Sequence, residues 1–407
     1  MARSSFAGFV GSALALVLGL LLTVAPLAFE SRYALGMASQ VGIAVLACLS
    51  FHVLWGQCGL LSFGHAAYTG AGAYLCMHTL QALNAQAWPL PVALLPLLAG
   101  LGTAVLALPL GWLCTRRPGT PFAMITLGVG ELAWAVALMW PAWSGGEAGL
   151  SGNRAAGPAW NGWDLGQASH LYALIAAHTL LGLVLVWGLT HTTLGRLLNA
   201  VRDNPLRVPL LGYDPQRLRL MAFVFAAFLA GVSGALAALH QEIVTPEVFS
   251  VHRSGSLLLF TLLGGATLLG PVLGGVLMVT VMVGLSGFTP AWLLYTGLVF
   301  MLGVVWAPQG VAGLLLAACR ACVDGRWRPD VPNAVFLFGA LCALAGGVAL
   351  VEMAYQLPQH GTLGPVRHLA GLALDTGQPT PWAAAVGLLL LGVALCRWVR
   401  KNKVGWP

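Results

Sequence analysis

The chain has 407 residues, of which 58% are apolar and only 8% charged, and its formal net charge is +7. Ordinary soluble domains carry about 25% charged residues, yet no Asp, Glu, Lys or Arg occurs from Tyr33 to Thr115. A soluble core of that size would need a charged surface around it. The composition therefore excludes a soluble protein and indicates an integral membrane protein surrounded by lipid.

Apolar runs of about 20 residues, the length that crosses a bilayer, follow one another along the chain. We expect spans near residues 8–28, 34–55, 62–82, 89–114, 121–141, 169–190 and 220–240, a Gly-rich pair within 254–306, and two more near 332–356 and 380–397. The sequence therefore predicts an all-α protein, a polytopic bundle of about 10–12 transmembrane helices.

Arginines gather in short segments between the apolar runs, and such segments mark the cytoplasmic side of a membrane protein. The basic segments are Arg116-Arg117, the loop 191–219, the cluster 320–328 and the tail 397–403. They share one side if both termini are cytoplasmic, which leaves the loop 142–168 outside. Because the arginines form orientation signals and no continuous stripe, we expect no nucleic-acid partner.

Two Gly-rich stretches, 56–65 and 264–275, interrupt apolar segments. The simpler interpretation is close helix packing through small residues. Interrupted helices at corresponding places in two halves instead point to a transport site. We expect discontinuous Gly-rich helices in each half, and the residues that we place on the substrate pathway are Gln57, Ser62, His65, Gly264 and Gly265.

Glu131 lies near the middle of the span 121–141. An ionisable side chain there is costly in lipid and by default faces the bundle interior or a cavity. Two interpretations stay open: Glu131 is a polar group on the substrate pathway, or it is a buried structural acid that hydrogen-bonds a neighbouring helix.

Several stretches resemble one family, the branched-chain amino acid ABC-transporter permeases. The run Trp55–Ala67 resembles the family's G-x-x-S-L-G-H-A-A-F signature, and Gly195–Asn204 is similar to its G-R-a-l-r-A-i-R-e-N. Further matches are 122–131, 144–152, 263–274 and Ala307–Gly310, where the family usually has Arg at the position of Ala307. The matches run in order over about residues 35–315.

The resemblance implies a heteromeric importer in the bacterial inner membrane. Its other parts are a second permease subunit, cytoplasmic ABC ATPase subunits and a periplasmic solute-binding protein. Residues 1–330 then form the permease domain. The extension 331–407, with about two further spans, has no counterpart in the family pattern.

The loop 191–219 is the predicted contact with the ATPase. The sequence of residues 195–204 predicts a short amphipathic helix that ends before Pro205, with Leu198 and Val201 on its apolar face. An apolar face on a cytoplasmic helix needs a cover, and we expect a groove on the ATPase to provide it. The coupling residues that we assign are Arg196, Leu198, Val201, Arg202, Asp203, Asn204 and Gly212.

No nucleotide site is predicted, because a P-loop needs a Lys and the only lysines are Lys401 and Lys403. We expect no enzymatic activity, cofactor or metal. The leading hypothesis is a permease subunit for branched-chain amino acids or related small solutes. The alternatives are urea, short amides or aromatic acids in the same importer class, and an ion-coupled secondary transporter, which usually carries more membrane carboxylates.

Overall fold

The structure is a computed structural model, and it describes residue 17 and residues 31–85, 90–155, 165–289, 291–306, 309–323, 331–357, 366–369, 372–375 and 377–402. The predicted span 8–28, except Val17, lies outside these residues, as do residues 324–328 of the arginine cluster and the end of the tail. The predicted all-helical membrane architecture is confirmed. Six of the described helices are long and apolar enough to cross a membrane.

The chain forms two compact units, residues 1–284 with 298–316 and residues 285–297 with 317–407. The helices of the first unit lie in chain order as α2 (Arg32–His52), α3 (Ala66–Asn84), α4 (Leu95–Thr115), α5 (Thr120–Met139), α6 (Pro141–Ser144), α7 (Ala168–His191), α8 (Thr193–Asp203), α9 (Pro215–Gln241), α10 (Val251–Gly264) and α11 (Leu269–Val279). A π-helical segment, Val53–Gln57, extends α2, and another, Thr280–Leu285, follows α11. Short 3-10 turns occupy Val92–Leu94, Gly146–Ala148, Pro209–Leu211 and Pro246–Phe249.

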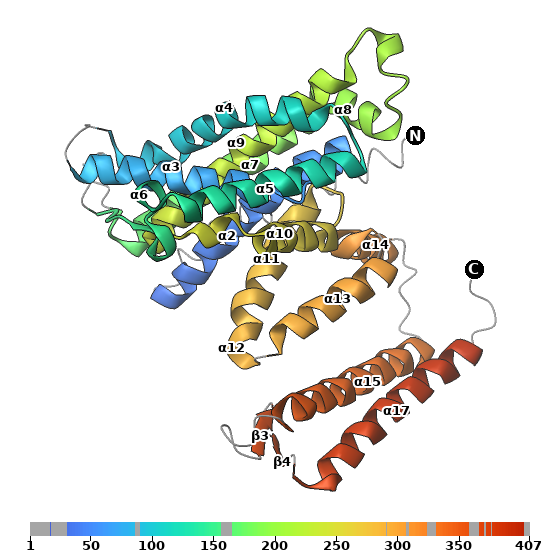
Figure 1. Cartoon of the computed structure of the whole chain (residues 1–407). Helices are drawn as coiled ribbons and strands as arrows, with labels where there is room; N and C mark the ends of the chain where they lie inside the picture. Colours follow the sequence, from blue (N-terminus) through green and yellow to red (C-terminus); the bar gives the residue numbers. More distant parts are fainter. Residues whose placement is uncertain are drawn as a thin grey trace. The chain divides into compact units, whose positions relative to one another are not determined.

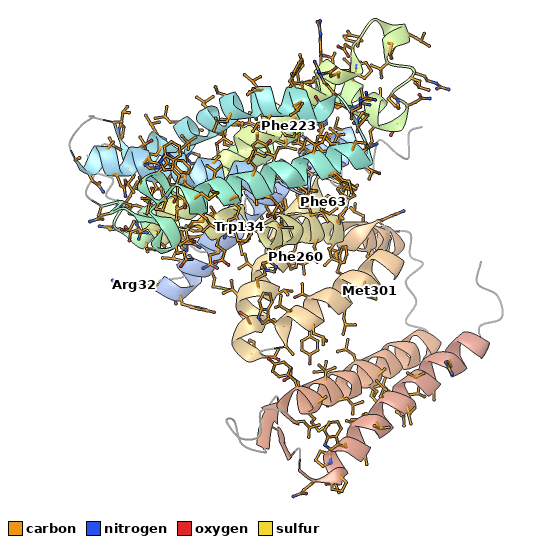
Figure 2. All side chains as sticks on the ribbon, in the orientation of Figure 1. Arg32, Phe63, Trp134, Phe223, Phe260 and Met301 are labelled. Carbon is orange, nitrogen blue, oxygen red and sulfur yellow. The ribbon has the colours of Figure 1, made fainter. Side chains whose placement is uncertain are left out.

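Helix α9 is the centre of the first unit and packs against α2, α3 and α4 (Figure 1). Its Phe223, labelled in Figure 2, makes edge-to-face contacts with Tyr68 of α3 and Phe122 of α5, with ring centroids 5.2 and 6.0 Å apart. Such aromatic contacts add to the burial of apolar surface. They join three helices that are far apart in the sequence.

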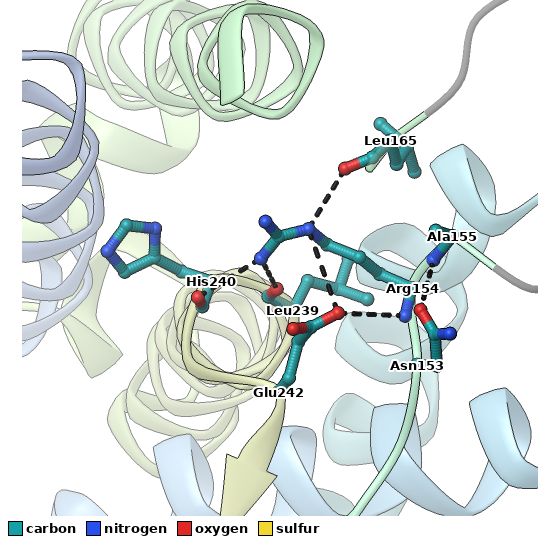
Figure 3. Close-up of polar contacts among 7 residues, drawn as sticks. All are labelled: Asn153, Arg154, Ala155, Leu165, Leu239, His240 and Glu242. Carbon is teal, nitrogen blue, oxygen red and sulfur yellow. Dashed lines mark hydrogen bonds and ion pairs between the residues drawn. The ribbon is translucent and has the colours of Figure 1, made fainter. Parts of the chain in front are cut away.

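The loop after α6 is fastened to the last turn of α9 through Arg154 (Figure 3). The Arg154 guanidinium donates to the carbonyl oxygens of Leu239 (3.0 Å) and His240 (3.2 Å), which are orphan acceptors at a helix end. Its backbone N–H donates to the carboxylate of Glu242, the residue that ends α9 with a φ of 57°. Strands β1 (Leu150–Ser151) and β2 (Ile243–Val244) pair antiparallel beside this clamp.

The second unit contains α12 (Ser286–Phe288), the start of α13 (Trp292–Trp306), the end of α14 (Gly310–Val323), α15 (Val331–Gln356), the hairpin β3 (Val366–Leu369) and β4 (Leu372–Asp375), and α17 (Pro379–Asn402). Helices α15 and α17 pack along each other. Glu352 of α15 is buried, and it accepts hydrogen bonds from the hydroxyls of Thr289 (2.5 Å) and Tyr295 (3.0 Å). This carboxylate joins α15 to the segment 285–297 within the unit.

Candidate functional site

The first predicted interruption is present, between the end of α2 and the start of α3. Helix α2 widens into a π-helical segment that ends at Gln57, and α3 begins only at Ala66. The buried Gln57 side chain donates to His52 Nε2 (3.3 Å) and accepts from the Asn199 amide (3.1 Å). The Arg202 guanidinium also donates to the Gly56 carbonyl. Helix α8 is therefore attached to the interruption through two side chains.

Ser62 and His65 are both fully buried in this interruption. The Ser50 hydroxyl donates its one proton to the Ala226 carbonyl (2.8 Å), so His65 Nε2, 2.6 Å from Ser50 Oγ, is the donor to that oxygen. His65 thus takes part in a bridge between α2 and α9. Ser62 Oγ has no hydrogen bond within the described residues.

The turn before α3 packs directly on α5. The Phe63 backbone N–H donates to Thr126 Oγ1 (3.2 Å). A Cβ atom at Gly64 would stand 1.8 Å from the Thr126 carbonyl oxygen, a backbone atom that cannot swing aside. Only glycine permits this approach of the two backbones.

We predict that Gly64→Ala separates the turn from α5 and destabilises the permease by about 1–3 kcal/mol or more, as overpacking does. Gly128→Ala on α5 is the matched control, since nothing lies within 4 Å of a Cβ atom there. Thermal melting followed by size-exclusion chromatography in detergent measures the difference. Equal melting midpoints for the two variants would contradict the predicted clash.

Glu131 does not face the bundle interior, so the expected inward orientation is wrong for this chain. The residue is exposed on α5, one position after Gly130, which faces Gly64. Trp134 of α5, labelled in Figure 2, is also exposed, at 37%. The 3.6-residue period places Glu131 outward once Thr126 and Gly130 face inward.

The second predicted interruption is also present, because α10 ends at Gly264 and α11 begins at Leu269. Gly265 has a φ of 113°, and a Cβ atom on it would stand 2.5 Å from the Gln309 carbonyl oxygen. Near the other end of α10, Ser254 Oγ accepts from the Ala66 N–H (3.0 Å). Ten residues of α-helix span about 15 Å. Gly264 and Gly265 therefore lie at the opposite end of α10 from Ser254, the residue through which α10 contacts the start of α3.

Helix α8 confirms the predicted amphipathic helix, but its apolar face is already covered. Leu198 is 0% exposed and Val201 2% exposed, both packed in the core of this chain. They are not free to anchor a partner, which corrects the role expected of them. Arg196, Arg202 and Asp203 are exposed, and Arg202 pairs with Asp203 at 3.0 Å.

The exposed apolar residues lie in the loop after α8, which projects from the end of the bundle (Figure 1). Leu206 is 83% exposed, Leu210 85% and Leu211 64%. Asn204 shapes the loop by accepting from the Leu206 N–H (3.1 Å), and Gly212 closes it with a φ of 82°. We call Leu206, Leu210 and Leu211 the leucine tip. The residues predicted from the sequence to contact the ATPase did not include these leucines, although leucines among arginines after a proline were a usable signal.

A cavity of about 490 Å³ lies between α2, α9, α10 and α11. None of the residues that the sequence placed on the pathway lines it. Its charged lining comes from Glu247 and Arg253, on either side of the α10 start. Two opposite charges close together in the sequence, Glu247 and Arg253, were the signal that could have found it.

A multi-pass helical bundle with two interrupted helices, a basic loop helix docked on one of them and a polar cavity has the features of a membrane transport permease. The family described as branched-chain amino acid transport system, permease component, matches residues 33–319, and the chain belongs to this family.

Two relatives are both named high-affinity branched-chain amino acid transport system permease protein LivM. The one from Escherichia coli K12 is 28% identical over 321 residues, covering 73% of this chain and 74% of the relative. The one from Salmonella typhimurium LT2 is 28% identical over 303 residues, covering 69% and 70%. No solved structure matches the chain significantly.

Proposed function

We propose that this chain is the transmembrane permease subunit of an ATP-binding-cassette importer in a bacterial inner membrane. It moves branched-chain amino acids or related small solutes into the cytoplasm, and separate ATPase subunits supply the energy. The observation that carries the proposal is the family match over residues 33–319, which includes both interrupted helices and α8. Residues 1–330 are the proposed permease domain, and 331–407 the extension.

The proposed contact with the ATPase is the leucine tip, with Arg196 and Arg207 at its rim. Exposed leucines in a basic loop are covered best by an apolar groove on a partner. Force on the loop reaches the membrane through α8, since Asn199 bonds Gln57 and Arg202 bonds Gly56. The first interruption is thus the element that ATPase motion displaces.

The proposed contact with the second permease subunit is the outer side of α5, which carries Glu131. A carboxylate in mid-span is costly against lipid, so a protein surface or an aqueous pathway faces it. The periplasmic binding protein would dock at the opposite end from α8, where the Arg154 clamp fixes the loop after α6. Both termini are then cytoplasmic.

Glu131→Gln is expected to lower uptake about tenfold, because it removes the charge that the facing surface or pathway accommodates. Membrane insertion and copurification of the second permease should be unchanged. Glu131→Asp, which keeps the charge, should retain most of the uptake. Initial rates of substrate uptake in whole cells provide the measurement, and normal rates in the Gln variant would show that Glu131 has no part in transport.

Co-expression with the ATPase and binding-protein subunits of an importer of this class tests the class of transporter. We expect the tagged chain to copurify with an ATPase, and uptake to require ATP hydrolysis. Uptake by the chain alone, driven by an ion gradient, would establish the secondary-transporter alternative.

A further inference from the structure

The cavity between α2, α9, α10 and α11 extends into the bundle from the end of α9 that lies away from α8. It runs along α9 from Gln241 back to Ser233, a distance of about 12 Å for eight helical residues. The segment just before α10 packs on α3, because Phe249 stacks on Tyr74, with centroids 5.4 Å apart. The start of α10 is therefore held against α3 beside the cavity.

Two opposite charges line this cavity without pairing. Glu247 and Arg253 interact electrostatically but form no direct ion pair, and neither side chain has a hydrogen bond within the described residues. Arg253 is partly buried, at the first turn of α10. A partly buried cation is costly unless a partner satisfies it, so Arg253 marks a candidate binding site. A ligand with both an anionic and a cationic group would satisfy the two side chains together.

A third polar group faces the same space. His240 Nδ1 is buried and has no hydrogen-bond partner within the described residues. The backbone carbonyl of His240 is held by Arg154, while the imidazole points away from Arg154 and Glu242 (Figure 3). The clamp at the end of α9 thus fixes the position of a ring that lines the cavity. An unsatisfied buried nitrogen is costly unless a ligand or water supplies its hydrogen bond.

The apolar part of the wall comes mainly from α2 and α11, and its members include Ile43, Ala44, Ala47, Leu257, Met278 and Val279. Polar side chains also line the cavity: Gln40, Thr69, Ser233, Gln241, Ser250, His252 and Ser256. Unbranched methionines adapt to side chains of differing shape. The cavity volume of about 490 Å³ falls in the usual range of small-molecule sites, about 300–1,000 Å³.

We propose that this cavity is a substrate-binding site for an α-amino acid with an apolar side chain. Arg253 binds the α-carboxylate, Glu247 binds the α-ammonium group with His240 beside it, and the wall of α2 and α11 receives the side chain. The proposal rests on the proposed import function and adds to it that the permease itself recognises the amino acid. A neutral solute such as urea carries no charged groups that could pair with Arg253 and Glu247.

The test uses the complete transporter, both permeases with ATPase and loaded binding protein, in proteoliposomes supplied with internal ATP. Initial uptake of labelled leucine is measured for wild type, Arg253→Gln, Glu247→Gln and Arg253→Lys, with copurification of all subunits as the check on assembly. Arg217→Gln is the matched control, since that arginine is exposed at the other end of α9. We expect uptake to fall about tenfold or more in both neutral variants. We expect partial uptake in the Lys variant and wild-type uptake in the control.

Wild-type leucine uptake in assembled Arg253→Gln and Glu247→Gln complexes would overturn the site and leave the import function standing. A wild-type complex that takes up no amino acid would overturn the import of amino acids, and this site with it. If Arg253→Gln fails to assemble, the outcome rests on Glu247→Gln, whose side chain is exposed to the cavity and to solvent.

Discussion

Replacing Leu206 and Leu210 together with Asp is expected to abolish substrate uptake, by about a hundredfold or more. Both side chains are more than four-fifths exposed, so the change leaves the core of the permease intact. Two carboxylates in an apolar groove of the ATPase are buried without partners, which costs several kcal/mol, and each 1.4 kcal/mol is a factor of ten. Copurified ATPase and uptake by the same preparation measure the effect.

Two comparisons make this result specific. Leu206→Met with Leu210→Met keeps the tip apolar and should retain both ATPase binding and uptake. Leu198→Asp places a charge in the core and should instead reduce the amount of folded permease, since Leu198 is fully buried. Normal ATPase binding and uptake in the Asp pair would show that the leucine tip is not the coupling contact.

Arg202→Ala is expected to leave the ATPase bound but to lower uptake about tenfold or more. The change removes the guanidinium that donates to the Gly56 carbonyl, and with it one of the two links between α8 and the first interruption. ATP hydrolysis should then continue while transport falls, so the ratio of substrate moved to ATP hydrolysed is the measurement.

Arg217→Ala serves as the control for Arg202, because its exposed guanidinium pairs only with Asp214 on the same helix turn. It should transport normally. Adding Asn199→Ala to Arg202→Ala should lower the ratio further, because it removes the second link. An unchanged ratio in the double variant would mean that motion reaches the membrane by another route.

Much of this architecture follows from local sequence patterns. The lengths of apolar runs predict the helices, and the glycine stretches predict both interruptions. The 3.6-residue period predicts α8, which forms as Thr193–Asp203. Each of these signals lies within about 20 neighbouring residues, where periodicity and propensity act.

Which surface covers a given face does not follow from such patterns. The period of α8 shows that Leu198 and Val201 are buried, but their cover is the chain's own core. The bond between Asn199 and Gln57 joins residues 142 positions apart, and only the tertiary fold reveals it. The same holds for Glu131, whose outward position depends on which side of α5 meets Gly64.

The most direct measurement of the import function is leucine uptake by the reconstituted complex of both permeases and the ATPase. Proteoliposomes receive loaded binding protein outside and either ATP or a non-hydrolysable analogue inside. Accumulation of leucine with ATP, and none with the analogue or without binding protein, is the predicted result. Accumulation that is independent of ATP and follows an imposed ion gradient would contradict the proposal.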